Sequence, residues 1–262
     1  EGFYSLAHLV RSFSHFVRGA GALKSIDGGN TWTQLPATAN WLHITRIAVS
    51  PSNPQIVLAS RRPGGIARSA DGGQTWTDVA VGELSFQVAF DPNNGMKAVA
   101  HFSSSGPLVH GVIVSTDSGL TWQPALTGLA SLSGEDARIE LCYARSVQGV
   151  VYASVGMSGG KIWRSADGGR NWTLRTTSGS TGASRYYNPF WVSPTDENLM
   201  VSGGVHSFRS TNGGTSVSQI SNGYILTVQP HPDIHFAIHD PDYNGTSNRR
   251  VWLPPAIPIS ST

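Results

Sequence analysis

One octapeptide, repeated five times, constrains this chain more than any other feature. Four copies occupy residues 25–32 (SIDGGNTW), 69–76 (SADGGQTW), 115–122 (STDSGLTW) and 165–172 (SADGGRNW). A divergent fifth copy, residues 210–217 (STNGGTSV), has Asn212 in place of Asp and Val217 in place of Trp. The starting serines lie 44, 46, 50 and 45 residues apart. A period of this length is what four short strands and their turns require.

Each repeat reads as four antiparallel strands, with the octapeptide joining the third strand to the fourth. Asp followed by Gly is typical of a hairpin turn, and residues 65–69 and 75–79 on either side alternate between apolar and polar. Upstream of each octapeptide lie two further apolar segments separated by a turn. These pairs are 44–51 with 56–60, 86–92 with 97–101, 139–144 with 149–154, 190–194 with 198–202, and 225–230 with 234–239. The fold class predicted is all-β, a β-propeller built from four-stranded blades.

The aspartates and tryptophans of the octapeptide are predicted to have structural roles. A turn-capping carboxylate suits a Gly-rich hairpin, and a large ring at the start of each outer strand can pack between adjacent sheets. These residues are Asp27, Asp71, Asp117, Asp167, Trp32, Trp76, Trp122 and Trp172.

The octapeptides resemble the Asp-box, or bacterial neuraminidase repeat, of pattern Ser-x-Asp-x-Gly-x-Thr-Trp. Families that carry it include sialidases, xyloglucan-hydrolysing glycosidases, sortilin-type receptors and photosystem-assembly factors. The resemblance implies a β-propeller with its box turns at the periphery, away from the active face. It does not choose among enzyme, receptor and assembly factor, because one scaffold hosts all three.

The repeats predict a single propeller domain over residues 1–262 with six blades. Five boxes give five blades, residues 224–253 supply strands of a sixth without a box, and residues 3–18 supply inner strands of the first. Either an N-terminal segment completes the last sheet, or the natural protein continues beyond Thr262 with a seventh blade. The Pro-rich residues 254–262 are predicted to form an extended tail.

Composition excludes several classes of protein. Eighteen Lys and Arg against sixteen Asp and Glu leave a formal charge of +2 without a basic cluster, so no nucleic-acid partner is predicted. Cys142 is the single cysteine, which excludes a disulfide framework and a Cys-rich metal site. No apolar run reaches the length of a membrane span, and no leader sequence is visible at Glu1.

Candidate functional residues lie where the innermost strands begin, because all blades converge there. The polar residues at these positions are His43, Arg46, Glu83, Gln87, Arg138, Glu140, Arg185, Tyr186 and Tyr224. The arginines could bind the carboxylate of an acidic sugar, since guanidinium groups recognise carboxylates through paired hydrogen bonds. Glu140 beside Tyr186 or Tyr224 would resemble the Tyr and Glu nucleophile of sialidases. The alternative is a set of solvent-facing strand ends.

The chain departs from the sialidase pattern, because the Arg-Ile-Pro motif is absent and the acid/base Asp cannot be identified. For a glycosidase with two carboxylates, the candidates are Glu83, Asp136 and Glu140, whose separation would decide between inverting and retaining chemistry. Asp91 is expected to serve its own turn.

The densest ionisable cluster spans residues 231–243 (HPDIHFAIHDPDY). On a strand, His235 and His239 would share a face, and with Asp233 they could bind a divalent metal. A His-Pro-Asp-x-His phrase also occurs in Asp-box propellers related to the xyloglucan-hydrolysing enzymes, which makes His231, Asp233 and His235 candidate substrate ligands. In the alternative interpretation the histidines pack locally. No other cofactor is predicted.

Two function classes remain almost equally supported. The first is a secreted or periplasmic, glycan-directed propeller, either a glycoside hydrolase or a degenerate relative that still binds sugar, with Trp41, Tyr186, Tyr187 and Trp191 available to stack on sugar rings. The second is a non-catalytic scaffold that binds a protein partner. A metal-dependent enzyme built on His235 and His239 is the third hypothesis.

Overall fold

The computed structural model describes residues 3–4, 19–104, 110–130, 138–156, 160–176, 181–184, 187–221 and 234–253. The chain divides into two compact units, Glu1–Pro124 (unit 1) and Ala125–Thr262 (unit 2). Within the described residues, all regular structure is β-strand except one 3₁₀ turn, η1 (Pro36–Thr38), so the predicted all-β class is confirmed. No helix in this part of the chain is long and apolar enough to cross a membrane.

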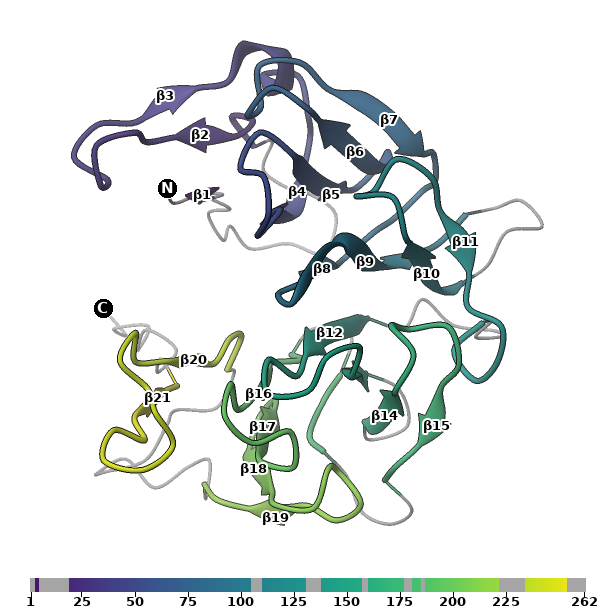
Figure 1. The fold of residues 1–262 in the computed structure, drawn as a ribbon, viewed down its shortest axis with the longest axis vertical. Helices are drawn as coiled ribbons and strands as arrows, with labels where there is room; N and C mark the ends of the chain where they lie inside the picture. Colours follow the sequence, from purple (N-terminus) through teal and green to yellow (C-terminus); the bar gives the residue numbers. More distant parts are fainter. Residues whose placement is uncertain are drawn as a thin grey trace, which may run out of the picture. The chain divides into compact units, whose positions relative to one another are not determined.

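Unit 1 contains three antiparallel sheets in which neighbours in space are neighbours in sequence (Figure 1). The first contains β1 (Phe3–Tyr4), β2 (Leu23–Lys24) and β3 (Thr33–Gln34). The second contains β4 (Ile44–Val49), β5 (Val57–Arg61), β6 (Gly65–Ser69) and β7 (Thr77–Ala80). The third contains β8 (Val88–Asp91), β9 (Asn94–Phe102), β10 (Gly111–Ser115) and β11 (Gln123–Pro124).

Unit 2 repeats this arrangement. One sheet contains β12 (Ile139–Tyr143), β13 (Val151–Val155), β14 (Lys161–Ser165) and β15 (Thr173–Leu174). The next contains β16 (Phe190–Val192), β17 (Met200–Gly203), β18 (Ser207–Ser210) and β19 (Ser218–Gln219). A pair follows, β20 (Ile238–His239) with β21 (Val251–Trp252). The strand predicted over residues 234–239 is thus regular only at its end, while residues 225–230 and the tail 254–262 lie outside the described residues.

The first strands of successive sheets lie side by side within each unit, β4 beside β8 and β12 beside β16. Apolar residues fill the space between the sheets, including Leu58, Ile66 and Phe90 in unit 1, and Tyr152 and Ile162 in unit 2. Innermost strands that face a common centre and sheets that pack face to face are what a propeller requires. The number of blades in the complete ring stays a prediction.

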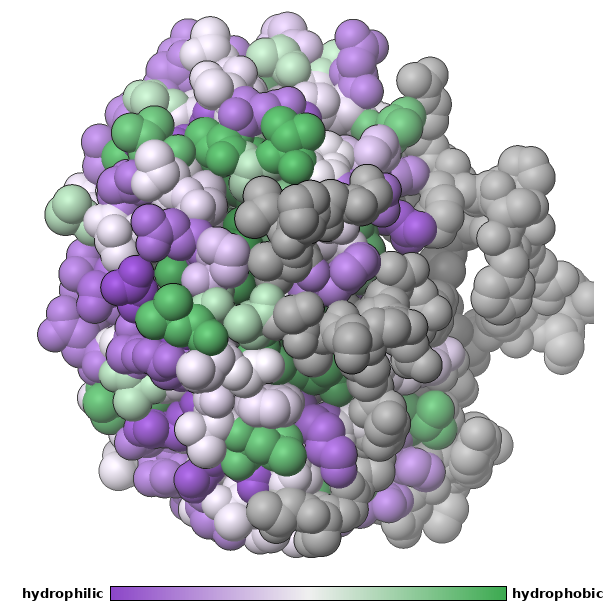
Figure 2. Space-filling view, turned by 90° about the vertical axis from the view of Figure 1, so that its right-hand side faces the viewer, coloured by the Kyte–Doolittle hydropathy of each residue, from purple (hydrophilic) through white to green (hydrophobic). Residues whose placement is uncertain are grey.

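Exposed hydrophobic residues do not merge into a broad surface. On the face drawn in Figure 2, hydrophobic residues lie in small groups separated by hydrophilic ones, wherever described atoms are visible. Such scattered groups are ordinary on soluble proteins and mark no site by themselves.

All five octapeptides fold into the same hydrogen-bonded turn. In the second copy, the Ser69 hydroxyl donates to Asp71 Oδ1 (2.7 Å) and accepts from the Gly73 N–H (2.8 Å). Asp71 in turn accepts from the backbone N–H and the hydroxyl of Thr75, and the Trp76 indole N–H closes the turn on the Gly73 carbonyl (2.9 Å). The carboxylate therefore caps the turn, which is a local structural task.

The first, third and fourth copies make the equivalent contacts, with Asn171 in the place of Thr in the fourth, and the burial of the tryptophans is graded. Trp172 is buried, Trp76 and Trp122 are half-buried, and Trp32 is 37% exposed. In the fifth copy Asn212 replaces the carboxylate. Its Oδ1 accepts from the Ser216 N–H (3.0 Å), and its amide donates to the Ser216 hydroxyl (2.8 Å).

The fifth copy shows how the turn would respond to mutation of Asp71. We expect Asp71→Ala to lower the free energy of unfolding of unit 1 by about 1–2 kcal/mol, because three capping contacts are lost. Asp71→Asn should cost much less, since Asn212 makes the equivalent contacts. Urea denaturation at pH 7 measures both changes, and equal losses in the two variants would refute the capping role.

The same contacts set the acid response of the turns. Hydrogen bonds from the side chain and backbone of Thr75, and from Ser69, lower the pKa of Asp71 to about 2. The equivalent bonds from Thr31 and Ser25 lower the pKa of Asp27 to about 2. Because the folded pKa lies below the unfolded value, this stabilisation is complete above pH 4 and is lost as the pH falls towards 2.

Candidate functional site

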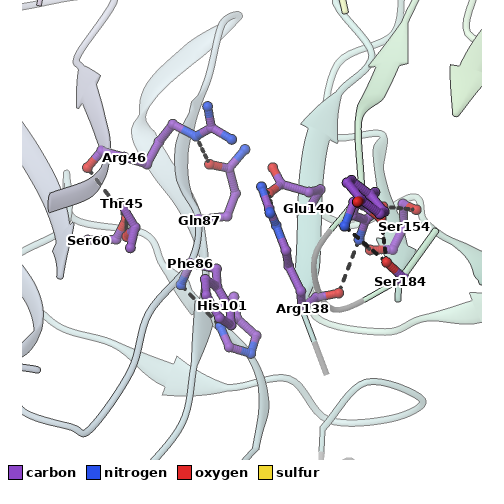
Figure 3. Close-up of polar contacts among 12 residues, drawn as sticks. Thr45, Arg46, Ser60, Phe86, Gln87, His101, Arg138, Glu140, Ser154 and Ser184 are labelled. Atoms are coloured by element: carbon purple, nitrogen blue, oxygen red, sulfur yellow. Dashed lines mark hydrogen bonds and ion pairs between the residues drawn. The ribbon is translucent and has the colours of Figure 1, made fainter. Parts of the chain in front are cut away.

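Glu140 is the second residue of β12 and is only 5% exposed. Arg138, two residues earlier, donates to Glu140 Oε1 from both Nε (2.9 Å) and Nη2 (2.8 Å) (Figure 3). Residues two apart on an extended segment point to the same side, which brings the two side chains together. A buried carboxylate is stable only when it is paired and hydrogen-bonded, and Arg138 supplies both interactions.

Asn188 anchors this pair to the neighbouring strands. Its amide group donates to the backbone carbonyls of Arg138 (3.1 Å) and Ser154 (2.9 Å), and its Oδ1 accepts from the Ser154 hydroxyl (2.6 Å). Ser154 pairs directly with Glu140 across the strands. We call Arg138, Glu140, Ser154 and Asn188 the β12 cluster. It presents fixed guanidinium and carboxylate groups at the start of an innermost strand.

Unit 1 places different polar groups at the start of its innermost strands. Arg46 donates from Nε to Gln87 Oε1 (2.5 Å) (Figure 3). Thr45 donates to the Ser85 carbonyl (2.6 Å). His43 lies just before β4, and burial, with a smaller effect of the positive charge of Arg62, lowers its pKa. His43 is therefore neutral near pH 7.

Of the three predicted carboxylates, the structure describes Glu83 and Glu140, which belong to different units. Glu83 is exposed between β7 and β8, belongs to unit 1, and holds the Ser103 carbonyl through its backbone N–H (3.0 Å). Glu140 belongs to unit 2, and Asp136 lies outside the described residues. Asp91 accepts from the Asn93 N–H (2.9 Å), as expected of a residue serving its own turn.

Several other predicted site residues also fall outside the described part of the chain. They are Arg185, Tyr186, Tyr224, His231 and Asp233. His235 is described and lies against Tyr187, with the ring centroids 5.3 Å apart. Among the described residues, no group of three His, Cys, Asp or Glu side chains is arranged to hold a metal ion.

His239 belongs to an aromatic cluster. Its Nδ1 accepts a hydrogen bond from the Trp191 indole N–H (3.1 Å), and Tyr243 packs edge-on against both rings. Trp191 is 5% exposed, so it does not offer a face to a sugar ring, and the stacking role predicted for it is wrong. Phe190 and Val192 pack into the core of unit 2, and Trp191, between them on β16, is buried on the other side against His239 and Tyr243.

The aromatic cluster should weaken in acid. Burial, together with the positive charge of Arg145, lowers the pKa of His239, although Asp240 opposes this. Protonation places a hydrogen on Nδ1 and breaks the bond from Trp191. Because the folded pKa lies below the unfolded value of about 6.5, the contribution is complete above pH 6.5 and is lost as the pH falls below it.

This response can be measured by urea denaturation of the wild type and His239→Gln at pH 7.5 and pH 5. We expect the wild type to lose more stability on acidification than His239→Gln, whose amide oxygen can still accept from Trp191 but does not titrate. Equal losses would show that another group controls the response.

Three comparisons place the fold among known proteins. No family model and no curated protein matches the chain. Solved structures do match. An ancestral GH74 enzyme superposes over 91% of this chain with a TM-score of 0.68 at 17% identity. The GH74 xyloglucanase from Xanthomonas campestris gives 0.62 at 20% identity over 91%, and an auxiliary nutrient binding protein from Bacteroides thetaiotaomicron gives 0.56 at 11% over 81%.

The chain is a β-propeller. Its four-stranded antiparallel sheets and these matches agree, and the resemblance to xyloglucan-hydrolysing propellers is confirmed at the level of the fold. This propeller spans 33%, 40% and 52% of the lengths of the three matched chains. It therefore corresponds to about a third to about half of each.

Sequence reasoning missed Asn188, which holds the β12 cluster together. A single asparagine between Tyr187 and Pro189 carries no distinctive pattern. Its role depends on three partners contributed by Arg138 and Ser154, both more than 30 residues away in sequence.

Proposed function

We propose that this protein is a glycan-binding β-propeller and that its sugar contact centres on the Glu140 and Arg138 pair of the β12 cluster. The observation that carries the proposal is a buried carboxylate, fixed by two donors of one guanidinium, at the start of an innermost strand. Support comes from the fold, since a GH74 xyloglucanase has a similar one.

The chemistry of the β12 cluster suits a polyhydroxylated ligand. Sugar hydroxyls both donate and accept hydrogen bonds, so they pair with a carboxylate acceptor and a guanidinium donor held side by side. Because Asn188 and Ser154 lock the backbone around Glu140, little conformational freedom is lost on binding. A xyloglucan fragment is the first ligand to test, and a secreted or periplasmic location belongs to the same proposal.

We propose binding in preference to hydrolysis because of the number of carboxylates. Glycosidases generally flank the scissile bond with two carboxyl groups. In the described part of unit 2, Glu140 is the carboxylate at the start of β12 and β16. One carboxylate is enough to hydrogen-bond a sugar. Hydrolysis generally needs a second carboxyl group, so that one acts as the acid and the other as the base or nucleophile.

The test compares two glutamates of unit 2 that form similar ion pairs with an arginine, of which only Glu140 lies in the proposed site. Glu197 accepts from Arg164 Nη2 at 2.8 Å, the distance that also separates Arg138 Nη2 from Glu140 Oε1, and both pairs lie in unit 2. We expect Glu140→Gln to weaken binding of a xyloglucan heptasaccharide at least roughly tenfold, equivalent to about 1.4 kcal/mol, and Glu197→Gln to leave it unchanged. Isothermal titration calorimetry measures the affinity, and thermal unfolding verifies that both variants are folded.

Other outcomes would point elsewhere. Equal affinities in the two variants would remove Glu140 from the site. Absence of binding to neutral and sialylated oligosaccharides alike would favour the scaffold that binds a protein partner. Turnover of a chromogenic glycoside that disappears in Glu140→Gln would instead establish a hydrolase.

A further inference from the structure

Unit 1 contains a hollow of about 460 Å³ whose lining includes Trp41 but no other residue predicted for a functional site. Its lining residues are Ala37, Trp41, Arg61, Trp76, Thr77 and Asp78. One wall is the segment from η1 to the start of β4, and the other is formed by the end of β5 and by β7. The volume lies within the range of roughly 300–1,000 Å³ that is usual for small-molecule sites.

The aromatic wall is fixed before any ligand arrives. The Trp41 and Trp76 ring centroids lie 5.1 Å apart with an interplanar angle of 68°, so the indoles form a corner. The Arg61 guanidinium stacks 4.4 Å from the centroid of Trp41 and forms an ion pair with Asp78. The Arg61 side chain is 9% exposed, and no described residue hydrogen-bonds its buried Nε. An unsatisfied buried donor costs stability, so this arrangement is not simply the most stable packing available.

Two polar groups of the hollow remain available to a ligand. The Asp78 side chain is 50% exposed, and Arg61 engages its Oδ1. The described residues provide no partner for Asp78 Oδ2 or for the hydroxyl of exposed Thr77. The three consecutive residues Trp76, Thr77 and Asp78 all line the hollow. The equivalents of Asp78 after the other boxes are Gln34, Pro124, Leu174 and Gln219.

We propose that this hollow is a second binding site, for a neutral saccharide. The C–H faces of a sugar ring pack against indole, and a hydroxyl can donate to Asp78 Oδ2 while Thr77 donates or accepts. A cationic ligand is disfavoured because Arg61 already occupies the face of Trp41. An anionic ligand would meet the exposed Asp78 carboxylate. The site is independent of the Glu140 site proposed above.

Two threonines provide a matched pair of variants. Thr77 and Thr33 each follow a box tryptophan, each begins an outer strand, and both are exposed. Only Thr77 lines the hollow, so Thr77→Arg should block it, and Thr33→Arg places the same side chain at the equivalent position of the first sheet. Glu140→Gln serves as the background, which removes the other proposed site.

The measurement is ¹⁵N NMR of the tryptophan indole N–H groups during titration with cellopentaose, maltopentaose and mannopentaose. We expect at least one of these to shift the Trp41 and Trp76 signals, assigned through Trp41→Phe and Trp76→Phe. Thr77→Arg should weaken this binding at least tenfold, Asp78→Asn at least threefold, and Thr33→Arg less than twofold.

Three results would overturn the proposal. They are the absence of shifts with all three pentasaccharides at 10 mM, equal affinities in Thr77→Arg and Thr33→Arg, and tighter binding of 3′-sialyllactose than of any neutral sugar. Because every titration uses the Glu140→Gln background, failure here leaves the Glu140 proposal standing, and failure of that proposal leaves this one standing.

Discussion

Gly119→Ala should destabilise unit 1 by about 2–5 kcal/mol. Gly119 has a φ of +80°, which costs an L-residue roughly 1–2 kcal/mol. A Cβ there would also lie 2.5 Å from Leu58 Cδ2 and 2.9 Å from Cδ1. Leu58, on β5, is fully buried in the hydrophobic core of unit 1, where it packs among other buried side chains. Overpacking of this kind adds roughly 1–3 kcal/mol.

Gly29→Ala is the matched control, because it occupies the same position of the first box. Its φ is +94°, and the nearest described atom to its Cβ would be in Trp32, at 3.7 Å. Only the backbone strain of about 1–2 kcal/mol is expected there. Urea denaturation compares the two variants. A loss in Gly119→Ala no larger than in Gly29→Ala would contradict the importance of the contact with Leu58.

The difference between these glycines shows what the octapeptide could and could not predict. Its pattern predicted a turn that needs positive φ, and the turn is present in every copy. The contact with the preceding sheet is long-range: Gly73 approaches Leu35, Gly119 approaches Leu58, and Gly214 approaches Ile162. The residue pattern of an octapeptide does not indicate which residue of the preceding sheet its glycine will approach. The first glycine of the box is less constrained, since Ser118 occupies that position with a φ of 60°.

The candidate site was likewise predictable where it depends on local spacing and not where it depends on long-range contacts. Arg138 and Glu140 were both predicted, and their spacing of two on a strand is enough to bring them together. The hollow as a whole was not predicted. Trp41, Arg61 and Asp78 come from three segments, and their proximity depends on how the sheet of β4 to β7 packs against the segment between η1 and β4. Two adjacent arginines such as Arg61 and Arg62 are typical of a solvated loop end, yet Arg61 is buried against Trp41.

Mutation of Asn188 is expected to have the second large effect on stability. Asn188→Ala should destabilise unit 2 by roughly 2–4 kcal/mol, because the carbonyls of Arg138 and Ser154 each lose a donor and the Ser154 hydroxyl loses its acceptor. Asn188 is 1% exposed, so water does not readily replace the lost groups. The same change should loosen β12 and abolish any glycan binding that depends on Glu140. Urea denaturation and calorimetry measure the two consequences separately.

Asn188→Asp has nearly the same shape and separates hydrogen bonding from volume. It replaces the donating amide with an oxygen that faces two carbonyls, so the ionised form should be at least as destabilising as Asn188→Ala, at roughly 3–5 kcal/mol. Burial raises the folded pKa of the introduced carboxyl above its unfolded value of about 4, so protonation favours the folded state. Relative to the wild type, the variant should therefore lose stability as the pH rises from 4 to 8, whereas the loss in Asn188→Ala should be independent of pH. A flat profile for Asn188→Asp would mean that the amide does not face the two carbonyls, and the β12 cluster would then lack the anchor on which its rigidity depends.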